Sequence, residues 1–347
     1  MIRAVQIARF RGIRDCVAEG LGRVNLIIGR NDCGKTAFLE ALRIADDGEN
    51  AARCSFEAQR ARMGGTAKVL DFERYWRPIF FDLDAGHGFS ISILRRGEGE
   101  WRTLKVQRDS GPQQLVLERV EGPGTRARDE GVVEGEETIN ATTWALSFQL
   151  TMPGREPVEE RVAATSSHVK IPARIYSHGG VWIGSGAGIG ENEIRFVSTI
   201  RQRGEDAALV EVLSQLDERL TSIELLAPSG DVAELFVRLD NGTPMLPVRL
   251  MGEGFQRCLE IAAAAAAHDW PTLFIDEIEN GMHHLVLEPL WRWLAMMSRR
   301  RDLQVFATTH SEECIHAACR AFQSLDDDGL RVIRLDRLES GTRATSY

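Results

Sequence analysis

Lysine is scarce in this chain of 347 residues, and metal-binding cysteine patterns are absent from its sequence. Nearly all of the 42 cationic residues are arginines, and the lysines are Lys35, Lys68, Lys105 and Lys170. The six cysteines form no Cys-x-x-Cys pair and have no spacing with histidine that is typical of a metal site. The sequence therefore gives no support to a zinc-binding module or a disulfide scaffold, and we expect reduced thiols.

Long hydrophobic runs and an excess of positive charge are also missing. Residues 1–6 lack the apolar core of a signal peptide, and the alanine run 262–267 is too short to cross a membrane. These features predict a cytoplasmic protein with no membrane partner. The net charge of −9 and the pI near 5.5 do not favour nucleic-acid binding by the surface as a whole, although a local basic patch stays open.

The bulk composition is that of a globular protein. Hydrophobic residues make up 43% of the chain and charged residues 27%. The length allows two domains, or one large domain with an insertion. The sequence shows no internal repeat and no long heptad tract.

A glycine-rich segment, Gly29–Thr36 (GRNDCGKT), matches the pattern G-x-x-x-x-G-K-[ST]. The apolar run 23–28 precedes it and predicts a buried strand, and residues 36–43 have the composition and spacing of a helix. A strand, a glycine loop and a helix N-terminus together form an anion site, because free N–H groups point at the phosphates. The pattern predicts that Lys35 contacts phosphate and that Thr36 holds Mg²⁺, although a chance glycine turn would show the same letters.

Two later segments supply acids and a histidine. The apolar run 273–275 predicts a buried parallel strand that ends at Asp276 and Glu277. Phosphoryl transfer depends on positioning and charge neutralisation, so we expect Asp276 to hold Mg²⁺ and Glu277 to polarise the attacking water. Residues 305–310 predict a second strand, which ends at His310, a candidate γ-phosphate contact. The alternatives are a solvated acidic turn and a packed histidine. The three segments in this order make ATP hydrolysis the leading hypothesis.

Alternating strand and helix patterns around the glycine loop predict an α/β P-loop NTPase with a mixed sheet covered by helices. We expect the ATPase core to comprise residues 1–65 and 228–347, with an inserted β-rich and then helical region at 66–227. The insertion should contain strands at 88–94, 101–106 and 115–120, a mobile loop at 121–137, and a helix at 207–220 whose apolar stripe ends at Leu220. Further strands are expected at 233–239, 247–250 and 330–335, and helices after 254, at 285–297 and at 312–322.

With these motifs the chain resembles the ABC-type ATPases related to SMC proteins and RecF, especially the ATPase modules of the OLD (overcoming lysogenization defect) family. The opening segment 7–13 (IARFRGI), the loop residue Asn31, the acidic segment 275–284 (IDEIENGMHH) and the segment 308–311 (TTHS) carry the resemblance. It implies that Gly29, Asn31, Asp32, Cys33, Gly34, Lys35 and Thr36 bind ATP. It also implies that Glu277 and His310 are catalytic.

The resemblance further implies a signature loop that contacts the nucleotide of a second subunit. Residues 250–257 (LMGEGFQR) lie where this loop is expected, which assigns Gly252, Glu253 and Gly254 to nucleotide binding. The usual Ser-Gly-Gly pattern is altered, since Gly252 stands at the serine position. The alternative is a glycine turn that caps a helix. The sequence does not place the family's glutamine-bearing loop.

The resemblance implies a homodimer or higher homo-oligomer that closes around ATP and Mg²⁺. SMC relatives carry long coiled coils, which are not found here, and OLD nucleases add a TOPRIM domain, for which the 37 residues after His310 are too few. We therefore expect a sensor or scaffold of a prokaryotic defence system that controls a separately encoded effector nuclease. A RecF-like, ATP-dependent DNA-binding repair protein is the alternative, and a nucleotide-gated assembly protein with little turnover is a third hypothesis.

Overall fold

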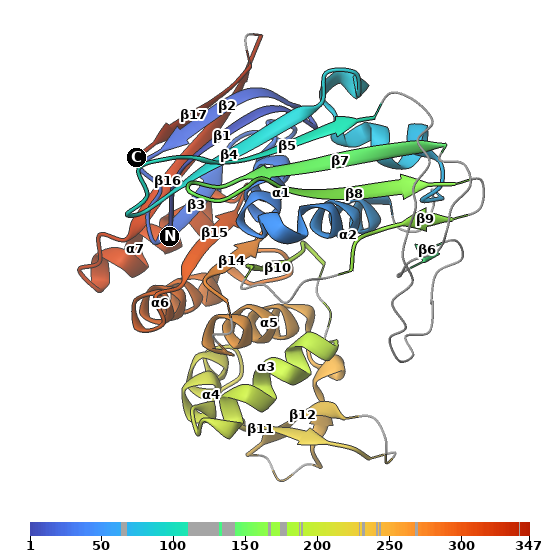
Figure 1. Cartoon of the computed structure of the whole chain (residues 1–347). Helices are drawn as coiled ribbons and strands as arrows, with labels where there is room; N and C mark the ends of the chain where they lie inside the picture. Colours follow the sequence, from blue (N-terminus) through green and yellow to red (C-terminus); the bar gives the residue numbers. More distant parts are fainter. Residues whose placement is uncertain are drawn as a thin grey trace.

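Three β-sheets organise the described part of the chain (Figure 1). They are seen in a computed structural model, which describes residues 1–63, 68–109, 132–133, 143–165, 168–173, 179–186, 188, 190–228, 230, 233–240, 242, 244–267, 270–339 and 341–347. The predicted strand at 115–120 and nearly all of the predicted loop at 121–137 lie outside these residues.

The central sheet has six strands in the order β10-β14-β15-β3-β16-β17. Its first five strands are parallel, and β17 pairs antiparallel with β16. The strands are β3 (Val24–Ile28), β10 (Val181–Ile183), β14 (Thr272–Ile275), β15 (Gln304–Thr308), β16 (Leu330–Leu338) and β17 (Gly341–Ser346). Because β3, β14 and β15 are parallel neighbours, the ends of these three strands meet at one edge of the sheet.

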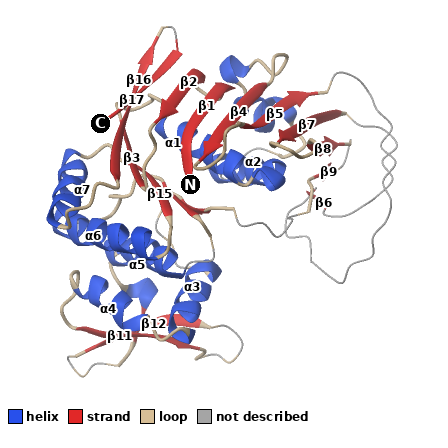
Figure 2. Ribbon diagram, turned by 60° about the vertical axis from the view of Figure 1, so that its left-hand side comes forward, coloured by secondary structure: helices blue, strands red, loops and turns tan. Residues whose placement is uncertain are grey.

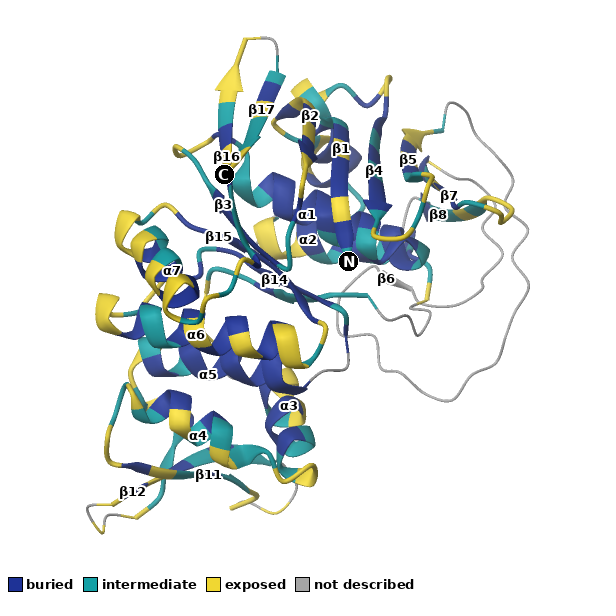
Figure 3. Cartoon of the chain, turned by 90° about the vertical axis from the view of Figure 1, so that its left-hand side faces the viewer, coloured by how far each residue is buried: buried dark blue, intermediate teal, exposed yellow. Residues whose placement is uncertain are grey.

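Both faces of this sheet are covered, which explains why its central strands are almost wholly apolar. Along β14, Phe274 faces one hydrophobic core while Leu273 and Ile275 face the other, and β15 alternates in the same way. The rings of Phe274 and Phe306 stack on one face with their centroids 5.6 Å apart. Figure 3 shows β14 and β15 buried along their length, whereas the surrounding helices have exposed residues on their outer sides.

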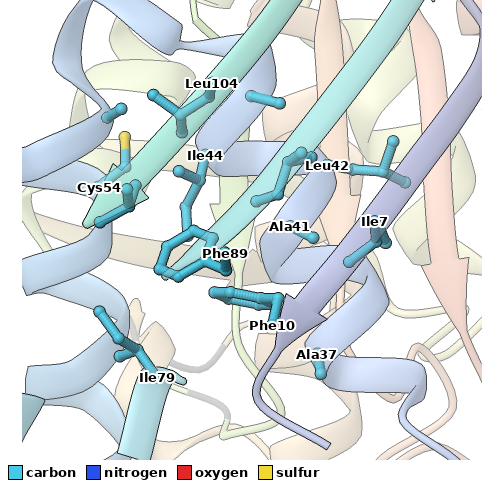
Figure 4. Close-up of a cluster of buried hydrophobic side chains, with 14 of the residues drawn as sticks. Ile7, Phe10, Ala37, Ala41, Leu42, Ile44, Cys54, Ile79, Phe89 and Leu104 are labelled. Carbon is cyan, nitrogen blue, oxygen red and sulfur yellow. The ribbon is translucent and has the colours of Figure 1, made fainter. Parts of the chain in front are cut away.

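An eight-stranded sheet covers one face, with the order β2-β1-β4-β5-β7-β8-β9-β6. It begins with the antiparallel hairpin of β1 (Ile2–Phe10) and β2 (Ile13–Glu19). From β1 the sheet continues with antiparallel pairing through β4 (Phe89–Arg95), β5 (Arg102–Arg108), β7 (Trp144–Thr151), β8 (Val158–Ala164) and β9 (Val169–Lys170). The last strand, β6 (Val132–Val133), pairs parallel with β9. Helices α1 (Lys35–Asp46) and α2 (Ala51–Met63) lie beneath it. Figure 4 shows Leu42 and Ile44 of α1 in the core with Ile7, Phe89 and Leu104 of the strands.

Helices α5 (Glu253–Ala267), α6 (His284–Arg300) and α7 (Glu312–Ser324) cover the other face of the central sheet (Figure 2). A small unit packs on the far side of α5. It contains α3 (Glu191–Gln202), α4 (Asp206–Ser214) and a three-stranded sheet of β11 (Leu220–Leu226), β12 (Glu234–Leu239) and β13 (Leu246–Pro247). Six consecutive alanines lie in α5, and their small side chains allow close packing from both sides.

The predicted bounds of two elements were wrong. The helix predicted to Leu220 ends at Ser214, and Leu220 instead begins β11, because it pairs with Leu239 of β12. The strand predicted at 247–250 is a strand only at Leu246–Pro247, after which Val248–Leu250 form a 3-10 turn. The division of the chain into residues 1–65 with 228–347 and an inserted 66–227 stays a prediction.

Candidate functional site

The glycine loop lies between β3 and α1, as its sequence predicts. Gly34 has a φ of +98° and caps α1, which begins at Lys35. A Cβ on Gly34 would also lie 3.2 Å from Cγ1 of Ile13. The left-handed backbone favours glycine here, and the contact leaves little room for a Cβ. The first N–H groups of α1, which follow Gly34, have no partner within the helix.

Lys35 lies over the loop from which its helix starts. Its Nζ donates to the carbonyl oxygens of Gly29 and Arg30, at 2.9 and 3.2 Å. Asn31 and Asp32 are exposed at the loop surface, whereas Cys33 is buried. Burial raises the pKa of the Cys33 thiol, and the nearby Lys35 ammonium partly opposes this shift.

Thr36 and Asp276 meet across the end of the sheet. The Thr36 Oγ1 lies 3.1 Å from both carboxylate oxygens of Asp276, although the two residues are 240 positions apart in the chain. Asp276 is 7% exposed. A hydroxyl and a carboxylate are hard oxygen donors of the kind that Mg²⁺ prefers, so the pair fits the predicted metal site.

Thr308 joins this pair from β15, which lies between β3 and β14. Its Oγ1 donates to Oδ1 of Asp276 at 2.6 Å and accepts the Glu277 N–H at 2.7 Å. Thr308 is fully buried. One hydroxyl therefore contacts both residues of the acidic motif.

Glu277 and His310 face each other at the surface. The His310 Nδ1 lies 3.9 Å from a carboxylate oxygen of Glu277 and 3.4 Å from one of Glu279. Glu279 also accepts the backbone N–H of His310 at 3.0 Å. The side chains of Glu277 and His310 are 40% and 53% exposed, which leaves them open to solvent and to ligands.

The predicted signature loop, Gly252–Gly254, lies at the N-terminus of α5. Gly252 and Glu253 are exposed. Gly254 packs against the acidic segment so closely that a Cβ there would lie 2.6 Å from the Gly281 carbonyl oxygen. Within the described residues, no hydrogen bond joins this loop to Gly29–Thr36 of the same chain.

The sequence motifs assign no role to Thr308, Arg257 or Glu279. Arg257 is a fully buried cation in the alanine-rich α5, where it pairs with Glu260 at 3.0 Å and donates to the Asp276 carbonyl oxygen at 2.7 Å. A lone arginine in an apolar helix face was the available signal, since a buried cation needs partners. Thr308 and Glu279 carried no such signal, because their partners lie on other elements.

The described geometry is that of a P-loop NTPase with an SMC-head-like fold. Residues 174–315, which include Asp276, Glu277 and His310, match the family model described as "AAA domain, putative AbiEii toxin, Type IV TA system". These residues are therefore similar to an AAA domain.

Solved SMC heads are similar over the whole chain. A head domain bound to the C-terminal winged-helix domain of ScpA has a TM-score of 0.53 and 11% identity, covering 100% of this chain and 98% of that one. A head with an extended coiled coil, bound to the C-terminal domain of ScpA derived from Pyrococcus furiosus, has a TM-score of 0.53 and 10% identity, covering 100% and 96%. These similarities establish the fold.

A curated relative from Helicobacter pylori is named "ATP/GTP phosphatase". It is 22% identical over 356 residues, which is 94% of this chain and 90% of the relative.

Among the described residues, no helix has both the length and the apolar character needed to cross a membrane.

Proposed function

We propose that this protein binds ATP with Mg²⁺ and hydrolyses it at the edge formed by β3, β14 and β15. The observation that carries the proposal is the contact between Thr36 and Asp276, beside the loop that bears Lys35. The AAA-domain match and the relative named ATP/GTP phosphatase also support NTP hydrolysis.

Each residue has a distinct part in the proposed reaction. The N–H groups of the loop and the Lys35 ammonium bind the β- and γ-phosphates, with Gly29, Asn31, Asp32 and Cys33 shaping the loop. Thr36 and Asp276 would hold Mg²⁺, which would supply positive charge that offsets the negative charge of the phosphates. Glu277 orients the attacking water and accepts its proton, while His310 contacts the γ-phosphate.

Phosphate release by two variants tests this proposal. Lys35→Ala removes the cation that faces the phosphates, and we expect kcat/KM for ATP to fall at least about 100-fold. Glu277→Gln keeps ATP binding but loses the proton acceptor, so kcat should fall about 100- to 10,000-fold. Lys105→Ala removes an exposed lysine of β5 and serves as the control. Wild-type turnover in Lys35→Ala would rule out the loop as the phosphate site.

The proposal extends to a homodimer, or a higher homo-oligomer, that closes around ATP. Gly252 and Glu253 are exposed at the N-terminus of α5. Among the described residues, the loop Gly252–Gly254 makes no hydrogen bond with Gly29–Thr36 of its own chain, which supports a role toward the nucleotide of a second copy. Backbone N–H groups there would contact the γ-phosphate, since Gly252 has no hydroxyl.

We further propose an OLD-like ATPase that acts as sensor or scaffold in a prokaryotic defence system and controls a separately encoded effector nuclease. The description of the matching family model as a "putative AbiEii toxin" of a toxin–antitoxin system supports the defence part of this proposal. Native mass spectrometry of tagged Glu277→Gln protein, isolated with Mg-ATP from its own host, is the test. A nuclease at fixed stoichiometry is expected. A homodimer that instead retains DNA, with affinity falling steeply as salt rises, would favour the RecF-like alternative, to which the net charge of −9 lends no support.

A further inference from the structure

Thr308 contacts three consecutive residues of the acidic segment. Its hydroxyl donates to the Asp276 carboxylate at 2.6 Å and accepts the Glu277 N–H at 2.7 Å. Its carbonyl oxygen accepts the Ile278 N–H at 3.1 Å. Because Thr308 is fully buried in the sheet, water does not replace these contacts when one of them is lost.

The contact with the Glu277 N–H coincides with an abrupt turn of the backbone. Asp276 still follows the strand, and its own N–H donates to Ile183 of β10 at 2.9 Å. Glu277 has a φ of +49°, a left-handed conformation that costs energy in a residue with a side chain. The Thr308 hydroxyl satisfies the N–H that this turn withdraws from the β ladder, while Ile278 anchors the far side of the turn in the core.

We infer that Thr308 is a positioning residue, which fixes the carboxylate of Asp276 at the proposed metal site and the backbone turn that carries the Glu277 side chain. This inference rests on the proposed ATP hydrolysis. It joins the two acids through a single hydroxyl, so removal of that hydroxyl should weaken metal binding and the chemical step together. ATP binding through the glycine loop should be retained, because Lys35 and the loop N–H groups lie between β3 and α1 or at the start of α1.

Thr308→Val tests the inference, because valine keeps the shape of threonine and loses the hydroxyl. Loss of an outer partner of a metal ligand typically costs about 10- to 100-fold. We expect kcat to fall by that factor and the Mg²⁺ concentration for half-maximal rate to rise about tenfold, with the KM for ATP within about threefold of wild type. Thr308→Ser restores the hydroxyl and should recover kcat to within about threefold. A general packing defect would not be rescued in this way.

Thr272→Val is the matched control, since Thr272 is buried at the opposite end of β14 from Asp276. Its kcat and Mg²⁺ dependence should stay within about twofold of wild type. Equal kcat and Mg²⁺ dependence in Thr308→Val and wild type would overturn the inference.

A second measurement separates this inference from the proposed function. If the wild type shows no hydrolysis that depends on Lys35, the proposed function fails. The positioning role of Thr308 is then tested by the binding of Mn²⁺ to the protein in the presence of ATP. Electron paramagnetic resonance should then show about tenfold weaker Mn²⁺ binding in Thr308→Val, and equal binding would overturn the role of Thr308.

Discussion

Glu160 of β8 shows how strongly the pKa of one half-buried side chain can respond to its surroundings. Its carboxylate accepts the Ala52 N–H at 3.1 Å at the start of α2. Burial, together with the charge of Asp47, raises the pKa of Glu160 from 4.5 to about 7, although the N–H contact opposes the shift. The folded protein therefore holds this proton more tightly than the unfolded chain does.

The raised pKa of Glu160 predicts a loss of stability with rising pH. The contribution of this proton to the free energy of unfolding is complete below about pH 4.5 and is lost as the pH rises to about 7, because Glu160 ionises at lower pH in the unfolded chain than in the folded protein. After allowance for the partly exposed side chain, the free energy of unfolding should fall by about 1 to 2 kcal/mol from this group. Urea unfolding at pH 5 and pH 8 measures this fall in the free energy of unfolding. Glu160→Gln should lack this contribution, whereas Glu159→Gln, at an exposed neighbour, should retain it; an unchanged pH dependence in Glu160→Gln would contradict the assignment.

At the scale of elements, the N-terminus of α5 and the acidic segment touch backbone to backbone. Gly254 lies so close to Gly281 that an added methyl would meet its carbonyl oxygen at 2.6 Å. Gly254→Ala must therefore move α5 or the loop, and overpacking of this kind costs about 1 to 3 kcal/mol of unfolding free energy. Gly252→Ala is the matched variant, since nothing lies within 4 Å of a Cβ there. Urea midpoints that fall equally in both variants would show that close packing is not the cause.

At the scale of the whole molecule, the proposed dimer predicts assembly that depends on ATP. Glu277→Gln with Mg-ATP should change from monomer to dimer in size-exclusion chromatography with light scattering, because slow hydrolysis traps the closed state. Adding Glu253→Arg places a large cation on the exposed signature loop and should prevent the dimer without preventing ATP binding. A dimer that persists in the double variant would remove this loop from the interface.

The parts of the site that depend on residues close together in the chain could be predicted from the sequence. The loop Gly29–Thr36 depends on glycine conformations and a helix start, which neighbouring residues specify. Strands that are buried on both faces appear as short apolar runs, so the end of β14 next to Asp276 could be located within a residue. β15 ends at Thr308, two residues before the predicted end at His310. The roles assigned to Glu277, His310 and Gly252–Gly254 remain predictions.

Tertiary structure decided what depends on partners far apart in the chain. The end of α4 at Ser214 and the start of β11 at Leu220 follow from pairing with β12, which the helical stripe of the sequence could not reveal. The Thr36 contact with Asp276 and the Thr308 contact with the Glu277 N–H exist because β15 lies between β3 and β14. The sequence by itself determined which chemical groups the protein carries at its strand ends. Only the order of the strands decided which of these groups meet, because hydrogen bonds form between atoms that the fold, not the chain order, brings together.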